Sequence, residues 1–143
     1  MTLPEILNDW HDASYIIEAM GKPYAPAPVP NGMPRYRAAG CCHYNSWRAC
    51  TADPRLHYVE GLARVPGING DWLVGHAWVT LDGVHAIDLT WRGARKRAHA
   101  SRSLDAATEY YGVEIPHADV TRLYVENGGP YLCLADWYRS EAA

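Results

Sequence analysis

Apolar side chains recur with helical spacing at several places along the chain. Over the first such segment they fall broadly on one helical side, and Gly21 ends the pattern. In a later segment Ser103 suits a helix N-cap and Gly112 suits a helix stop. The spacing predicts four helices, over residues 3–20, 42–51, 103–112 and 130–140.

Strand-like patterns lie between the second and third predicted helices, over residues 56–65, 75–81 and 84–91. This order of elements predicts an α+β fold, with N-terminal helices packed on an antiparallel β-sheet. A chain of 143 residues has room for one sizeable core, so we expect a single domain over residues 1–143. Residues 22–34 contain five prolines, which predict an extended, stiff connector on the domain surface.

The loop between the last two predicted strands decides which side chains share a face. A two-residue loop would place His76 and Asp88 on opposite faces of the hairpin. A three-residue loop closed by Gly83 pairs Thr80 with Val84 instead. His76 then lies directly opposite Asp88. The same register gathers four apolar side chains on the other face, Ala77, Val79, Ile87 and Leu89. Because the shorter loop would bury Asp88 among them, we predict the three-residue loop.

Composition narrows the classes of function. The formal net charge of −3 argues against a general nucleic-acid binder. No segment reaches the roughly 18–20 consecutive apolar residues of a membrane span, so we expect no membrane partner. The N-terminus carries acidic residues and no early Lys or Arg. We therefore expect no signal peptide and a cytoplasmic protein.

The chain has four cysteines, Cys41, Cys42, Cys50 and Cys133. They form no CxxC pair, so we expect neither a zinc framework nor another cofactor. Free thiols are the default in a reducing cytosol. For Cys50 and Cys133 we expect the role of small buried apolar residues.

Cys42 differs from the other cysteines because it begins a predicted helix. The helix dipole and the free backbone N–H groups at that end lower the pKa of a thiol. Cys41 falls on the incoming loop, and His43 would point elsewhere on a helix. A carboxylate opposite an imidazole orients the ring and stabilises the imidazolium, so His76 and Asp88 suit a general base for the thiol. A cross-strand ion pair is the alternative for these two residues.

Three motifs together resemble the transglutaminase-like branch of the papain-type cysteine enzymes. They are CHYNS at residues 42–46, HAW at 76–78 and DLTW at 88–91. The resemblance covers roughly residues 36–91 and implies a papain/transglutaminase-like fold. It also implies a catalytic triad, with Cys42 as nucleophile, His76 as base and acid, and Asp88 as the orienting carboxylate.

The same resemblance implies a cysteine-dependent hydrolase or acyl transferase that forms a thioester intermediate. The bond attacked would be an amide, peptide, isopeptide or thioester in a protein or peptide substrate. We expect Trp78, Asn45 and Tyr44 to contact that substrate. The alternative is a non-catalytic protein-binding module that retains the fold. No metal site is expected, because adjacent ligands at a helix start rarely converge on one ion.

Overall fold

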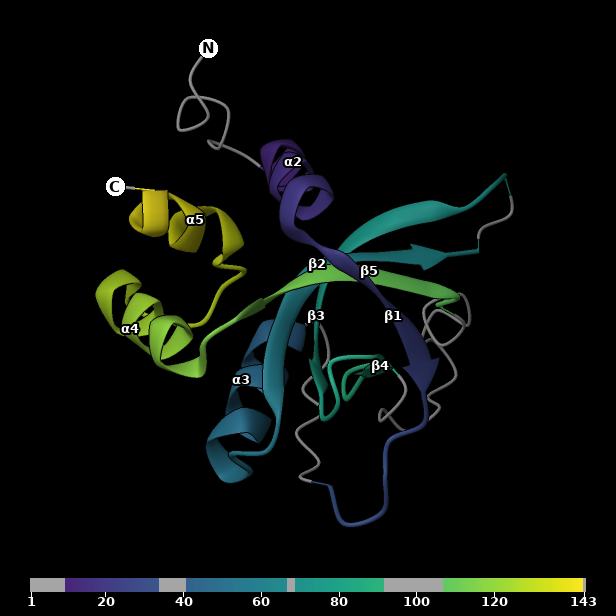
Figure 1. The fold of residues 1–143 in the computed structure, drawn as a ribbon, viewed down its shortest axis with the longest axis horizontal. Coiled ribbons are helices and arrows are strands. Elements are labelled where there is room, and N and C mark those ends of the chain that lie inside the picture. The colour runs from purple at the N-terminus through teal and green to yellow at the C-terminus, as the bar shows by residue number, and fades with distance from the viewer. Residues whose placement is uncertain (1–9, 34–40, 67–68, 92–106, 143) are drawn as a thin grey trace.

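The computed structural model describes residues 10–33, 41–66, 69–91 and 107–142 (Figure 1). Along the chain the elements are α2 (Trp10–Met20), β1 (Lys22–Ala27), α3 (Cys42–Ala52), β2 (His57–Val65), β3 (Trp72–Thr80), β4 (His85–Ile87), β5 (Glu109–Ile115), α4 (His117–Asn127) and α5 (Leu134–Ala142). No helix in these ranges is long and apolar enough to cross a bilayer.

The five strands close into a barrel in the order β1-β4-β3-β2-β5. The predicted papain/transglutaminase-like α+β fold, with helices packed on an antiparallel sheet, is therefore wrong. The closing strand is β1, which lies in the proline-rich segment 22–34. Its first half pairs with β5 in antiparallel fashion, and its second half pairs with β4 in parallel. Residues 22–27 of this segment are extended, but they form a barrel strand in which Tyr24 is buried.

The predicted helix over residues 103–112 is also wrong where the structure describes it. Residues 109–115 form β5, and Ser103 lies outside the described residues. Gly112 is not a helix stop: a Cβ atom there would lie 2.8 Å from the Trp78 ring. The glycine therefore marks a close approach between two barrel strands. Long-range packing overrides the local helical pattern here.

Side chains fill the barrel interior and also cover its outer wall. The interior holds Tyr24, Val59, Ala63, Val65, Trp78, Ala86, Ala107 and Tyr110. A larger core lies outside the wall, where buried residues from α2, α3, α4 and α5 pack against β2, β3 and β5. Figure 1 shows α2, α4 and α5 gathered on one side, with α3 beside β2 and β3. Three predicted helices are confirmed within the described residues, whereas α4 was not predicted.

The hairpin of β3 and β4 has a longer loop than predicted. A three-residue loop puts Val79 opposite His85, but the structure pairs Val79 with Ile87. The Asp82 carboxylate holds the longer loop, because it accepts the backbone N–H groups of Val84 and His85 at 2.8 Å each. The predicted register is therefore wrong by two residues.

A shift of two residues leaves every side chain on its predicted face, because strand side chains alternate with a period of two. Ala77, Val79, Ile87 and Leu89 do lie together, in the outer core. His76 and Asp88 keep the other face. The left-handed conformation of Gly83, with φ of 73°, also agrees with the prediction of a glycine-closed turn. The face assignment, on which the candidate site depends, is confirmed.

Candidate active site

Cys42 is the first residue of α3. Cys41 precedes the helix with φ of −117° and ψ of 47°, and its carbonyl accepts the first helical hydrogen bond, from Asn45 N at 2.9 Å. Cys42 thus lies in the turn whose N–H groups have no partner within the helix. Both neighbouring cysteines are half-buried. Of the two, the Cys42 sulfur is the one that interacts with His76.

His76 lies on β3 and is only 1% exposed. The face of its ring stacks on Trp91, with ring centroids 3.5 Å apart and an interplanar angle of 9°. Its Nε2 atom lies 2.8 Å from Asp88 Oδ2. The stacking and the hydrogen bond together fix the ring, so the other nitrogen, Nδ1, is the one left for the sulfur.

Asp88 follows β4 at the point where the chain turns, and it is fully buried. Its Oδ1 accepts the backbone N–H groups of Thr90 at 3.2 Å and Trp91 at 3.0 Å. Its Oδ2 accepts the Tyr110 hydroxyl at 2.8 Å and the His76 ring. Burial alone would raise the pKa of this carboxyl, but the His76 charge and these hydrogen bonds outweigh burial and lower it. Asp88 is therefore a charged, fully bonded partner for the imidazole.

The electrostatics of Cys42 and His76 favour the charged forms of both groups. Burial by itself raises the pKa of the Cys42 thiol. This effect is outweighed by hydrogen bonds from His43, His76 and the Ala77 backbone N–H and by the His76 charge, so the pKa is lowered to about 6. Burial lowers the pKa of His76, but the charge and hydrogen bond of Asp88 and the Cys42 sulfur raise it to about 9. A thiolate–imidazolium pair is thus favoured between about pH 6 and about pH 9.

His43 takes part in this arrangement, contrary to the prediction that it would point elsewhere. Its imidazole hydrogen-bonds the Cys42 sulfur and lowers the pKa of the thiol, while His76 lowers it through both a hydrogen bond and its charge. The side chain is half-buried at the second position of α3. The dipeptide Cys42-His43 was visible in the sequence, but an ideal helix directs adjacent side chains apart. The first turn of a helix allows more freedom than that geometry suggests.

The residues predicted to contact substrate have other surroundings. Trp78 is fully buried in the barrel, edge-on to Tyr110 with ring centroids 5.1 Å apart. Asn45 is fully buried, and its Nδ2 donates to Thr90 Oγ1 at 2.9 Å. Neither side chain is open to a substrate in this structure, so these two predictions are corrected. The Asn45 bond instead joins the start of α3 to the turn that carries Asp88. Tyr44 is half-buried, and its role stays a prediction.

Tyr110 was missed as a site residue because its segment was interpreted as a helix. The pattern that identifies it is the alternation of buried and exposed side chains along β5, where Tyr110 is buried and Tyr111 is 38% exposed. Such alternation is typical of a strand. The two adjacent tyrosines conceal it, because they are chemically alike.

The remaining cysteines behave as predicted in their burial. Cys50 is 4% exposed and Cys133 is fully buried. Burial raises the pKa of the Cys50 thiol to about 12 and, with the Glu60 charge, raises that of Cys133 well above its ordinary value. Within the described ranges, no group of three or more His, Cys, Asp or Glu residues is placed to hold a metal ion.

No family model, no curated protein and no solved structure matches this chain. The arrangement of Cys42, His76 and Asp88 therefore has to be interpreted from its own geometry and electrostatics.

Proposed function

We propose that the protein is a cysteine-dependent hydrolase or acyl transferase. The bond attacked is an amide, peptide, isopeptide or thioester, and the acyl group passes through a thioester on Cys42. His76 acts as the acid and base, and Asp88 orients its ring. The observation that carries the proposal is the pairing of a half-buried thiol of low pKa, at a helix N-terminus, with a buried imidazole fixed by a charged carboxylate.

Acylation begins with attack by the Cys42 thiolate on the carbonyl carbon. The C–S bond forms while the carbonyl electrons move to oxygen, giving a tetrahedral oxyanion. For that oxyanion we propose the Cys42 backbone N–H, at the start of α3, as a hydrogen-bond donor. When the C–N bond breaks, the imidazolium of His76 gives its proton to the leaving amine. The products of this half-reaction are a free amine, a thioester and neutral His76.

Deacylation reverses these roles. Neutral His76 takes a proton from water, and the resulting hydroxide attacks the thioester carbon. The C–S bond breaks, the carboxylic acid leaves, and the thiolate–imidazolium pair is restored. If an amine replaces water, the same steps give a new amide, and the reaction is acyl transfer. Charge and protons balance in both cases, with no oxidant, reductant or metal.

The proposal rests on these side chains and not on the overall architecture. The resemblance of the Cys42, His76 and Asp88 motifs to transglutaminase-like enzymes supports the same roles, and it stays a prediction about the site alone. A protein or peptide substrate and a cytoplasmic location are likewise proposals that follow from the sequence.

Alkylation of Cys42 by iodoacetamide tests the proposal, because it reports the thiolate without requiring the substrate. The modified position is identified by peptide mass spectrometry, in the wild type and in the Cys41→Ala and Cys42→Ala variants. We expect Cys42 to react about 20-fold faster at about pH 6 than an unfolded cysteine of ordinary pKa, after allowing for the weaker nucleophilicity of a less basic thiolate. Acyl-transfer substrates are then sought with a panel of activated esters and amide electrophiles.

Cys50 and Cys133 are internal controls, because both are buried and have raised pKa values. They should stay unlabelled while the protein is folded. If Cys42 labels no faster than an unfolded cysteine, the proposed thiol enzyme is wrong. Retention of cellular activity by a Cys42→Ser variant would instead favour a non-catalytic binding module.

A further inference from the structure

Tyr110 reaches the candidate site from a part of the chain far from the three motifs. It lies on β5, is 1% exposed and stands opposite Tyr24 on β1. Its ring packs against Trp78, whose indole occupies the space beside Gly112. A phenylalanine ring would fill this position equally well. Because the chain has 10 Tyr and no Phe, the choice of tyrosine is not informative by itself.

The contact of the hydroxyl is informative. Tyr110 Oη donates to Asp88 Oδ2 at 2.8 Å, and His76 Nε2 lies 2.8 Å from the same oxygen. The other carboxylate oxygen is already held by the backbone N–H groups of Thr90 and Trp91. Tyr110 is thus the side chain that shares with His76 the oxygen through which the carboxylate acts. Charge-assisted hydrogen bonds of this kind are among the strong ones in proteins.

We propose that Tyr110 is a positioning residue that holds Asp88 in place and sets how strongly Asp88 stabilises the protonated form of His76. This inference rests on the proposed function, since it concerns the same thiol–imidazole pair. A hydroxyl that donates to a carboxylate withdraws part of its negative charge. Asp88 therefore stabilises the imidazolium less than it would without Tyr110, which keeps His76 able to release its proton to a leaving group.

Other titratable groups face the pair from neighbouring elements. Cys42 and His43 approach from α3, and Tyr124 of α4 is close enough to interact with the Cys42 charge. None of these contacts Asp88 in the hydrogen bonds that the structure describes for that carboxylate, which come from His76, Tyr110 and two backbone N–H groups. An effect of the Tyr110 hydroxyl on His76 should therefore pass through Asp88.

The test compares two alkylating reagents on the Cys41→Ala protein over about pH 4 to about pH 10. Neutral iodoacetamide follows the thiolate, whereas anionic iodoacetate is also attracted to the imidazolium. The rate with iodoacetate divided by the rate with iodoacetamide therefore falls at the pH where His76 loses its proton. In Tyr110→Phe we expect that fall to move upward by about half a pH unit, because Asp88 regains negative charge. Thermal unfolding of each variant confirms that it is folded.

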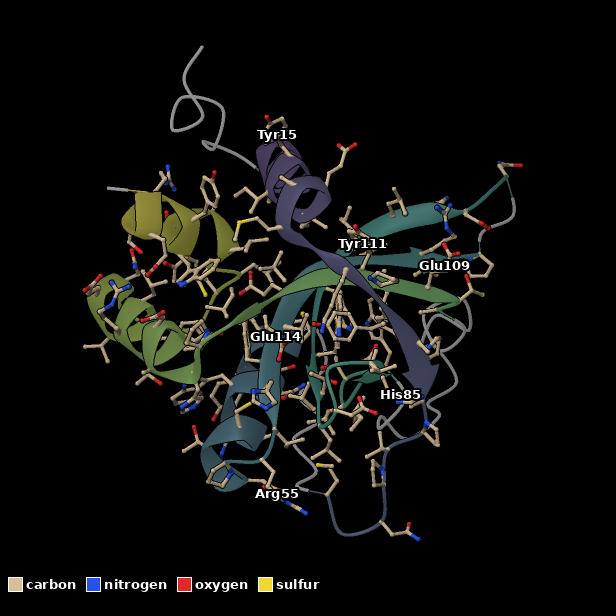
Figure 2. The ribbon with its side chains drawn as sticks, viewed as in Figure 1. Tyr15, Arg55, His85, Glu109, Tyr111 and Glu114 are labelled. Carbon is tan, nitrogen blue, oxygen red and sulfur yellow. The ribbon has the colours of Figure 1, made fainter. Side chains whose placement is uncertain are left out.

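Two controls separate this role from simple packing. Tyr111→Phe removes a hydroxyl from the adjacent residue of β5, which is 38% exposed. Tyr111 is labelled in Figure 2, and this variant should not change the pH at which the rate ratio falls. In the Asp88→Asn protein, adding Tyr110→Phe should give no further shift, because the hydroxyl acts through the carboxylate. The inference would be overturned if Tyr110→Phe is folded and its rate ratio falls at the same pH as in the wild type. If the wild type shows no thiolate near neutral pH, the proposed function itself fails, which is a distinguishable result.

Discussion

In the described part of the barrel, two buried carboxylates lie near cysteines whose pKa values shift in opposite directions. Asp88 and Glu60 are both fully buried. Asp88 lies near Cys42, with His76 as its direct partner. Glu60, on β2, accepts the Cys133 thiol directly at 3.3 Å. The pKa of Cys42 is lowered to about 6, whereas that of Cys133 is raised well above its ordinary value.

The imidazole accounts for the difference. At Asp88 the positive charge of His76 stands between carboxylate and sulfur, so both anions are stabilised by one cation. At Glu60 the partners are the Tyr58 hydroxyl at 2.6 Å and the backbone N–H groups of Cys133 and Leu134. These donors are neutral, and burial raises the pKa of Glu60. The carboxylate therefore opposes ionisation of the thiol next to it.

The two arrangements consequently serve different purposes. Glu60 binds the backbone N–H groups at the start of α5, which joins that helix to β2 and stabilises the fold. Asp88 binds an imidazole whose other nitrogen faces a half-buried sulfur. A buried carboxylate beside a cysteine is thus no sign of a reactive thiol unless a cation lies between them.

Removing Glu60 should have the largest effect on stability. In Glu60→Ala, the Tyr58 hydroxyl and two backbone N–H groups lose their acceptor inside a closed core. We expect the free energy of unfolding to fall by about 3 kcal/mol, measured by urea denaturation. Alkylation of Cys42 should be unchanged, because Glu60 is not among the groups that shift the pKa of the Cys42 thiol. Glu141→Ala, at an exposed position of α5, is the matched control and should change the free energy of unfolding little. A loss of Cys42 reactivity in folded Glu60→Ala would show that the two regions are not independent.

Replacing His76 should make Cys42 resemble Cys133. In His76→Gln the amide can still donate to Asp88, but no positive charge separates that carboxylate from the sulfur. The pKa of the Cys42 thiol should then return to its ordinary value or above, and alkylation at about pH 6 should slow by about 20-fold. The measurement is the iodoacetamide rate on the Cys41→Ala background. An unchanged rate would mean that His76 does not control the sulfur.

The sequence predicted the central part of the site because its signals are local. A cysteine at a helix start and a His/Asp pair on one hairpin lie within residues 42–88. The face assignment survived an error of two residues in the register, because only an odd shift exchanges faces. Local patterns of this kind depend little on the rest of the fold.

The barrel and Tyr110 were not predictable in the same way. Closure depends on pairing between β1 and both β4 and β5, which lie about 60 and about 88 residues further along the chain. Two prolines in β1 also argue against a strand. Without β1 and β5, no local pattern brings Tyr110 to Asp88. The role of His43 depended on side-chain freedom at a helix start, which no periodicity encodes.

The smallest expected effect concerns His43, and it tests whether one imidazole or two stabilise the thiolate. In His43→Ala, Cys42 loses one hydrogen bond and keeps His76. The pKa of the thiol should rise, but by less than in His76→Gln, because the charge supported by Asp88 remains. We expect alkylation at about pH 6 to slow by about twofold to threefold.

His57→Ala removes an imidazole that is exposed and paired with Glu114, and it should leave the rate unchanged. Comparing His43→Gln with His43→Ala then tests the hydrogen bond itself, because only the glutamine retains a donor. A rate that rises in both variants would mean that His43 shields the sulfur and does not stabilise its anion.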